Sequence, residues 1–386
     1  MSQFILINRI KVQNANAVAG FTWGFPAITH FLGFAHSLGR KLQESPYSRL
    51  SFSGTAVIAH EHHVHVYGAY GDSFTQSRSP PYLHSHDDKA AAPPVIEEGK
   101  MNMTVSLLIG CDGNIGNQDS DLLDWLNTQC YLQRLAGGTI LEIGGLDIVR
   151  AEEVAQQRTV KRKLLPGFVL VDRSASLQSH YENLTESGTS AEQLEAWLDF
   201  SAYKEQARPN HNLIDRYLQG LYKMEEENSE LLWREWSAHL ERIPYDAADI
   251  PDTVKSYFAG LEGDKNTKSI LDQWNQYLEP TEKTAADWER LPKPEAKGYL
   301  VPIVCGYKAI TPVYKNDQIE NTRDSETPVC FVEAVHSVGE WRSVHHLRSE
   351  KDFNDVLWTY HHEDHWYLCR QSNDAETISN TTDNEF

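Results

Sequence analysis

The chain has 386 residues, a formal net charge of −20 at pH 7, 40% hydrophobic residues and 10% aromatic residues. That apolar content is sufficient for a packed core and excludes a wholly disordered chain, and the length allows two domains or one large domain with an insertion. No apolar run reaches the roughly 18 residues that a membrane-spanning helix needs, so we expect no membrane span.

The first 150 residues alternate between strand and helix patterns. The predicted strands have apolar residues at period two, and the predicted helices have them at helical spacing. The fourth strand contains a Gly144-Gly145 break. In chain order the predicted elements are strand 4–12, helix 25–42, strand 52–68, strand 100–110, helix 119–135 and strand 139–149. This strand-helix-strand-strand-helix-strand order is typical of the ferredoxin-like fold of RNA-recognition domains.

The remaining segments differ in character. Residues 71–95 are rich in Ser, Pro and His and lack apolar periodicity, which indicates a long loop or extended arm. Residues 191–290 have apolar stripes at helical spacing and five of the ten tryptophans, which indicates packed helices. Further strands are predicted at 168–172, 298–304, 328–335 and near 356–368.

The negative charge is concentrated in two places. Residues 181–290 have a net charge of −12 and the tail 371–386 has −4, whereas residues 1–60 have +4. The overall charge therefore does not exclude an RNA-binding surface on the rest of the chain. The predicted domains are a core at 1–180 with the loop 71–95, an acidic helical insertion at 181–297, a β-rich part at 298–370 that completes the core, and a flexible acidic tail at 371–386.

Two sequence features indicate a cytoplasmic protein. The apolar run at the start of the chain follows no basic segment, so it favours a strand over a secretory signal. The five cysteines are scattered and form no CxxC pair, which argues against a disulfide framework or a zinc ribbon.

Histidines form the most conspicuous clusters. In His60-Glu61-His62-His63-Val64-His65, the HExxH zinc pattern fails because Val64 stands where histidine is needed. Two strand-spaced histidines could bind a metal with a third ligand such as His84 or His86, but a solvated strand is favoured. A second group, His345-His346 and 361–365, has no accompanying nucleophile motif. The sequence also lacks GxxxxGK[ST] and GxGxxG, so we predict no metal and no cofactor.

Several polar residues could contact nucleic acid. Lys161-Arg162-Lys163 is a short basic run that would matter if it lined a groove with Arg134, Arg9 and Lys11. Gln13, Asn14 and Asn16 can read base edges or sugar hydroxyls, but they equally suit hydrogen bonds in a turn. The residue pattern alone does not decide between these roles.

Longer strings in the sequence resemble a known family. They run in one order from residue 4 to about 370, and together they resemble the Cas-five-type subunits of type I-F CRISPR surveillance complexes, the second Csy proteins. The strings include Arg9–Ala17, Thr22-Trp23-Gly24-Phe25-Pro26, Phe31–His36, Glu97-Glu98-Gly99, Arg134–Ile140, Leu164-Leu165-Pro166-Gly167-Phe168, Gly298–Ile303, Gly306-Tyr307, Arg323–Pro328, Phe331-Val332-Glu333, Gly339-Glu340-Trp341 and Leu357–His362. Residues 181–290 depart from the family pattern by being longer, more helical and more acidic.

The resemblance implies a non-catalytic subunit with an α+β, ferredoxin-like, RNA-recognition-motif core of the RAMP type and a long arm or thumb. Such a subunit would hold the 5′ handle of the CRISPR RNA, pair with the large subunit and abut a backbone subunit. Target double-stranded DNA would be engaged through the assembled complex. The RNA-binding residues expected from the motifs and from charge are Arg9, Lys11, Gln13, Asn14, Asn16, Arg134, Lys161, Arg162, Lys163 and Arg323.

Three alternatives remain open at this point. Trp23 and Phe25 could stack a base or belong to the core. The chain could be a metal-independent endoribonuclease that cuts repeat RNA, an idea that the His60–His65 cluster motivates. The acidic helices could be a protein-interaction module, a brake on stray nucleic-acid contact, or a purely structural element.

Overall fold

The computed structural model describes residues 3–68, 72–78, 95–113, 115, 119–186, 192–261, 267–322, 324 and 326–372. Contacts divide the chain into two compact units: unit 1 combines Met1–Ser201 with Ala296–Phe386, and unit 2 is Ala202–Glu295. Across the described ranges, none of the helices has the length and apolar character to cross a bilayer.

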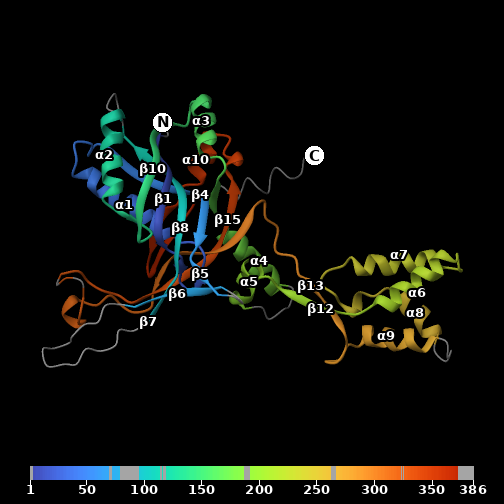
Figure 1. The fold of residues 1–386 in the computed structure, drawn as a ribbon. Coiled ribbons are helices and arrows are strands. Elements are labelled where there is room, and N and C mark those ends of the chain that lie inside the picture. Colours follow the sequence, from blue (N-terminus) through green and yellow to red (C-terminus); the bar gives the residue numbers. More distant parts are fainter. Residues whose placement is uncertain are drawn as a thin grey trace. The chain divides into compact units, whose positions relative to one another are not determined.

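Unit 1 is a mixed α+β structure with a large antiparallel sheet (Figure 1). Its first elements match the predicted order and are β1 (Gln3–Asn16), α1 (Ile28–Gln43), β4 (Ser51–Val64), β8 (Lys100–Asp112), α2 (Asp119–Tyr131) and β10 (Gly138–Arg150). These four strands lie in the spatial order β10-β1-β8-β4, and every neighbouring pair is antiparallel. The strand and helix predictions for this part of the chain are therefore confirmed.

The sheet continues on both sides of these four strands. Its full order over the described residues is β16-β17-β14-β15-β11-β4-β8-β1-β10-β9. The added strands are β9 (Arg134–Leu135), β11 (Phe168–Asp172), β14 (Tyr299–Ala309), β15 (Val332–Ser343), β16 (Thr359–Glu363) and β17 (Trp366–Arg370). Smaller elements of unit 1 are β2 (Val18–Ala19), β3 (Thr22–Trp23), β5 (Val66–Tyr67), β6 (Ser73–Arg78), β7 (Val95–Glu98), α4 (Ser174–Glu186), η3 (Asn316–Gln318), η4 (Val344–His346) and α10 (Glu350–Asp355).

Each face of the sheet has its own core, because successive side chains of a strand point to opposite faces. Ile5 and Ile7 of β1 pack with the buried stripe of α1, which includes Phe31, Leu38 and Leu42. Phe4 and Leu6 point the other way and pack with α3 (Val154–Leu164), α10 and η4. Figure 1 shows α1 and α2 on one side of the sheet and α3 and α10 on the other.

The helix α5 (Gln193–Ser201) belongs to unit 1, although the sequence groups it with the acidic helical block. Trp197 is 8% exposed and its indole Nε1 donates to the Ser337 carbonyl at 2.9 Å. Phe200 is buried in the same small cluster, beside Val338 of β15. The predicted stripe is Leu194, Trp197 and Leu198; Trp197 and Leu198 do pack in this cluster, whereas Leu194 is 57% exposed.

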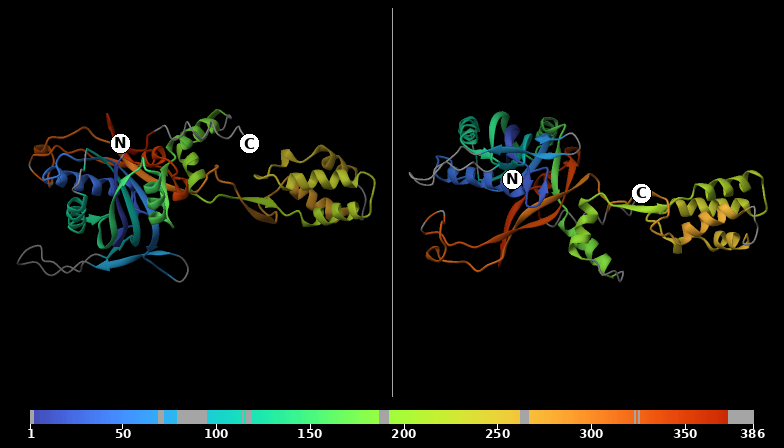
Figure 2. Two further views of the ribbon diagram at one scale, coloured as in Figure 1. Left: turned by 90° about the horizontal axis from the view of Figure 1, so that it is seen from above. Right: turned by 60° about the horizontal axis from the view of Figure 1, so that its bottom comes forward.

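Unit 2 consists of a group of helices inserted between two antiparallel strands, which form a ribbon (Figure 2). It contains β12 (Glu205–Pro209), α6 (Asn212–Lys223), α7 (Ser229–Leu240), η1 (Ala247–Asp249), α8 (Asp252–Gly260), α9 (Lys268–Leu278) and β13 (Ala286–Arg290). The predicted stripes of α6, α7 and α9 form its core, with Trp236, Phe258 and Trp274 at the centre. The ribbon strands are antiparallel, so the two ends of unit 2 leave the ribbon side by side.

Several elements of the structure were not predicted, including α4 and α10. The helix α3, which carries Lys161-Arg162-Lys163, was not predicted, because its apolar stripe of Val160 and Leu164 is short and embedded in charged residues. The helix α8 and the ribbon were not predicted either. Within the predicted arm 71–95, β6 pairs with β7, and residues 79–94 lie outside the described part of the chain.

Candidate nucleic-acid interface

A β-bulge in β1 divides the sheet face that lies opposite α1 and α2. Before the bulge this face is apolar and covered by α3 and α10, and after it the face is polar. Two residues of β1, Asn8 and Arg9, stand opposite the single residue Ser106 of β8, and Arg9 has a φ of +47°. The neighbouring strand β10 follows the same course, with Gly144 and Gly145 opposite this point. A β-carbon on Gly144 would lie 3.2 Å from the Arg9 side chain, so the predicted glycine break makes room for the bulge.

A hydrogen-bonded cluster occupies the bulge. The Arg9 amide donates to Ser106 Oγ at 2.8 Å, and Ser106 Oγ is 3.1 Å from Asn8 Oδ1. His60 bridges this cluster to the next turn, with Nε2 2.7 Å from Ser106 Oγ and Nδ1 2.7 Å from the Pro166 carbonyl oxygen. Burial is the largest influence on His60 and lowers its pKa, which favours the neutral ring.

Arg9 also fixes the C-terminal end of α3. Its guanidinium Nη2 donates to the Leu165 carbonyl at 2.8 Å, directly after the helix. Arg9 was predicted as an RNA contact, but here it is partly buried and holds a turn. We therefore interpret it as a positioning residue for the basic end of α3.

Beyond the bulge the sheet has an open polar face, opposite to α1 and α2. Lys11 and Gln13 are exposed, while the alternating residues Ile10 and Val12 are buried against the helices. Lys11 lies opposite Thr104, which lies opposite Glu61, and Asn102 lies opposite His63. We call this surface the polar face; its residues are Lys11, Gln13, Glu61, His63, Asn102, Thr104 and Glu142.

The predicted residues of the N-terminal motif have different environments. Lys11 Nζ is 2.6 Å from Glu142 Oε2, and both side chains are more than half exposed, so this ion pair adds little stability and can be exchanged for a phosphate. Asn14 is exposed with a φ of +56°, and its amide donates to Asn102 Oδ1 at 3.1 Å. Asn16 closes a local turn, because its Nδ2 donates to the Val18 carbonyl and its Oδ1 accepts from the Val18 amide.

Arg134 lies at the edge of the same region. It is exposed on β9, opposite Thr139 of β10, which in turn pairs with Gln13. Its Nη1 donates to the Gly137 carbonyl at 3.3 Å. The structure thus brings Gln13 and Arg134 to one end of the sheet. Arg323, the last predicted contact, lies outside the described residues.

The basic run lies in the last turn of α3. Arg162 is exposed, Lys161 is half-buried, and Lys163 Nζ is 2.7 Å from both carboxylate oxygens of Asp147 on β10. Two of the three predicted phosphate contacts therefore carry no acidic partner among the described ion pairs. The third would have to leave Asp147.

A second group of basic residues lies beside α3 and was missed by sequence reasoning. Val344 of η4 packs in the same core as Val160 and Leu164 of α3, and its amide donates to the Gly167 carbonyl. Burial lowers the pKa of His346, and the neighbouring charges of Arg342, Arg348 and Lys297 lower it further. We call Lys161, Arg162, Lys297, Arg342, His346 and Arg348 the basic patch. Within it, Arg342 Nε lies 4.0 Å from the buried Glu340 carboxylate, and the lowered pKa of His346 favours its neutral ring.

The remaining histidine clusters do not form a reactive or metal-binding site in the described structure. The rings of His63 and His65 are 6.1 Å apart, and no group of three or more metal-ligating side chains occurs within the described ranges. His84 and His86, the suggested third ligands, lie outside those ranges. Ser106, although bonded to His60, is fully buried, so it is not accessible as a nucleophile.

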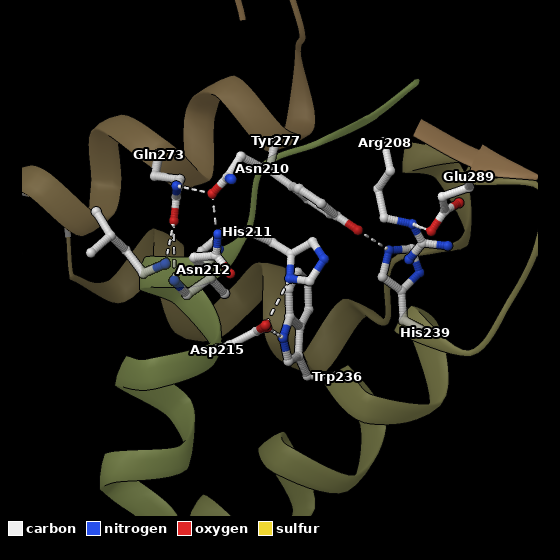
Figure 3. Close-up of polar contacts among 12 residues, drawn as sticks. Arg208, Asn210, His211, Asn212, Asp215, Trp236, His239, Gln273, Tyr277 and Glu289 are labelled. Carbon is white, nitrogen blue, oxygen red and sulfur yellow. Dashed lines mark hydrogen bonds and ion pairs between the residues drawn. The ribbon is translucent and has the colours of Figure 1, made fainter. Parts of the chain in front are cut away.

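Unit 2 contains a buried polar network that the sequence did not indicate (Figure 3). Asp215 accepts from the indole Nε1 of Trp236 at 2.6 Å and contacts His211 Nδ1 at 2.8 Å. On the other side, His239 Nε2 is 2.9 Å from the Tyr277 hydroxyl, and the buried Arg208 is paired with Glu289. Arg208 also donates to the Arg242 carbonyl, just after α7, at 2.5 Å, so the network joins the ribbon to the helices and we interpret it as structural.

One residue of this network predicts a pH dependence of unit 2. Burial, with added repulsion from Arg208 and Arg242, lowers the pKa of His239 to about 4, against 6.5 for an ordinary histidine. Between those values the unfolded state binds the extra proton, so unit 2 loses stability as pH falls, by up to about 3 kcal/mol at 1.36 kcal/mol per pKa unit. Hydrogen exchange of α7 at pH 7 and pH 5 measures this loss after correction for intrinsic rates.

The His239→Gln variant should lack this part of the pH dependence, whereas the control His361→Gln, on the exposed strand β16, should retain it. Equal pH dependence in the His239→Gln variant and the wild type would contradict the assignment.

Comparison with known proteins adds independent information. A family model described as "CRISPR-associated protein (Cas_Csy2)" matches residues 5–235 and 258–369. The interval between the matched ranges lies inside the acidic helical region. "CRISPR-associated protein Csy2" of Pseudomonas aeruginosa (strain UCBPP-PA14) is 30% identical over 389 aligned positions, which cover 95% of this chain and 94% of that protein.

Proposed function

Because the chain belongs to the Csy2 family of CRISPR-associated proteins, we propose that it is a non-catalytic RNA-binding subunit of a type I-F CRISPR surveillance complex. In this role it holds the 5′ handle of the CRISPR RNA in the cytoplasm. It pairs with the large subunit and abuts a backbone subunit, and the assembled complex engages target double-stranded DNA by base pairing with the guide.

The topology of unit 1 supports the RNA-binding part of the proposal. The order β10-β1-β8-β4, with α1 and α2 on one face, supports our proposal of a ferredoxin-like core, because that fold has the same order of strands and helices along the chain. RNA-recognition domains bind RNA on the sheet face opposite the helices. In this chain α3 and α10 cover half of that face, and the polar face is the half that remains open.

The single observation that carries the proposal is the position of the basic patch. It lies at the end of α3, and Arg9 links that end to the strand that bears Lys11 and Gln13. Phosphates need cations, and base edges need donors and acceptors. In this proposal, the basic patch provides the cations and the polar face provides the donors and acceptors, and both act on the same RNA strand.

A reconstitution experiment tests the proposal. The purified chain, its large-subunit partner and repeat-derived RNA should form a complex whose affinity depends on the handle sequence. A handle of the same length and scrambled sequence is the control. Equal affinity for both RNAs would contradict handle recognition.

The endoribonuclease alternative predicts that the isolated protein cleaves repeat RNA, whereas the proposed function predicts no cleavage. We expect the lone protein to leave repeat RNA intact, because none of the hydrogen bonds or ion pairs found among the described residues joins His63 to an acid or base, and Ser106 is fully buried. Gel analysis of labelled repeat RNA, with and without the protein, measures this. Cleavage that disappears in the His63→Ala variant would make the chain an enzyme instead.

A further inference from the structure

The two halves of the large sheet in unit 1 are joined over a short distance. The strands β4 and β11 pair at only two positions in the described structure, Ala59 with Phe168 and Ile58 with Val169. Beyond this seam β4 continues to Val64 alongside β8 alone. A cavity of about 490 Å³ opens there, lined by residues of β4, β11, β14, β15 and the segment from Ala19 to Pro26.

The walls of this cavity are mostly aromatic. Trp23 and Phe25 come from one side, and Phe168, Tyr299 and Trp341 come from the other half of the sheet. Phe25 meets Trp341 edge to face at 5.0 Å, and Phe168 meets Tyr299 edge to face at 5.8 Å. Tyr299 is 68% exposed. The exposed ring of Tyr299 offers a surface on which a planar group can stack.

The polar groups of the cavity suit a neutral, planar ligand. No Asp, Glu, Lys or Arg side chain lines it, so it offers no direct partner to a phosphate or an acidic group. The indole Nε1 of Trp23 is buried without a hydrogen-bond partner in the described structure. A buried donor of this kind is stabilised when a ligand provides an acceptor.

One residue, His60, connects the cavity to the cluster at the β1 bulge. His60 lines the cavity, and its two ring nitrogens contact the Pro166 carbonyl oxygen and Ser106 Oγ. Those contacts lead directly to Asn8 and Arg9, where the polar face begins. The lining residues Leu170, Ile303 and Trp341 belong to the core on the α1 side of the sheet, so an RNA on the polar face reaches the cavity by crossing the edge of β4 beyond Ala59, where β4 pairs only with β8.

We propose that this cavity receives one unstacked nucleobase of the bound RNA, an inference that rests on the proposed function. The phosphate groups stay outside, on the basic patch and the polar face, while the base enters between the aromatic walls. The volume is in the range of small-ligand sites. Stacking of one base on aromatic side chains contributes about 1–3 kcal/mol, or roughly 5- to 150-fold in affinity.

The test combines one protein variant with a set of RNAs. Each handle nucleotide is replaced in turn by an abasic site, and affinity is measured for the wild type and for Tyr299→Ala. At one position the abasic RNA should bind the wild type at least about tenfold more weakly. Tyr299→Ala should lose a similar factor with intact RNA and nothing further with that abasic RNA. Tyr299→Phe, which keeps the ring, should restore binding.

The control variant is Tyr203→Ala, which removes a tyrosine of similar exposure from unit 2 and should leave the affinity for every RNA unchanged. If Tyr299→Ala and the abasic sites act independently at every position, the cavity proposal is wrong, although handle binding can stand. If the wild type does not distinguish the handle from scrambled RNA, the proposed function fails first. If Tyr299→Ala weakens only the association with the large subunit, the cavity holds a protein side chain and the proposal is overturned.

Discussion

Replacing Lys161, Arg162 and Lys163 together by glutamine is expected to weaken handle RNA binding by about 100-fold at low salt. Each phosphate contact to a single strand adds about 0.7 to the slope of log affinity against log salt, so loss of three contacts should lower that slope by about 2. Titrations at several salt concentrations measure both quantities. The effect should be nearly independent of RNA sequence, because phosphates are the same at every position.

A second variant separates the role of Lys163 from that of the others. Lys163 pairs with Asp147, so its loss also leaves a carboxylate without its partner. The double variant Lys161→Gln/Arg162→Gln spares this pair and should still lower the slope by about 1.4. The matched control, Arg234→Gln/Lys255→Gln, removes two cations from unit 2 and should leave the slope unchanged. An unchanged slope in the triple variant would show that α3 does not contact the RNA.

Two deletions that differ in their boundaries should have opposite effects on unit 1. Removing residues 202–295 and joining the ends by a short Gly-Ser linker should leave the fold and RNA affinity of unit 1 intact. The linker can be short, because Lys204 and Leu291 are hydrogen-bonded across the ribbon. Removing residues 191–290 also takes α5, with the buried Trp197 and Phe200, and should cost unit 1 several kcal/mol, since one Trp→Ala substitution costs about 3–5 kcal/mol.

Thermal unfolding of both proteins, followed by RNA titration, measures these outcomes. The single substitution Trp197→Ala in the full chain is the control, and it should reproduce most of the destabilisation of the longer deletion. If the 202–295 deletion unfolds unit 1, unit 2 is structural. If it folds but loses the large subunit, unit 2 is an interaction module.

Much of unit 1 could be predicted because its signals are local. The buried stripe of α1 and the alternation in β1 and β8 follow directly from the spacing of apolar residues. The helical stripes of α6, α7 and α9 were readable for the same reason. In contrast, α3 has a composition dominated by charge, and its position depends on packing with residues distant in sequence, such as Phe4, Leu6 and Val344.

The site was less predictable, since it depends on contacts between distant residues. Sequence spacing could not predict which faces of the sheet Asn8, Arg9 and Lys11 occupy, because a period of two cannot anticipate a bulge. The basic run at 161–163 was recognised, but its neighbours Arg342 and Arg348 lie about 180 residues later. Both arginines flank His345-His346 in the sequence, and this local cluster of basic residues was the one signal that could have pointed to Arg342 and Arg348.

Unit 2 also shows why its acidity was hard to interpret. It contains 12 Lys or Arg and 19 Asp or Glu, yet its central contacts are neutral or paired, such as Asp215 with Trp236 and Arg208 with Glu289. The excess acid lies on its surface, where it affects partner choice more than folding.

The bulge at Arg9 has a consequence for how this part of the chain tolerates changes in length. In β1, Arg9 is one residue more than β8 has at this point. In β10, Gly144 is the residue opposite Arg9, so β10 matches β1 in length here. Deleting either one alone would shift β1 against β10, whereas deleting both would leave two regular strands in register with the same faces. The residues at positions 9 and 144 should therefore be gained or lost together. A relative that has no residue equivalent to Arg9 should also have none equivalent to Gly144.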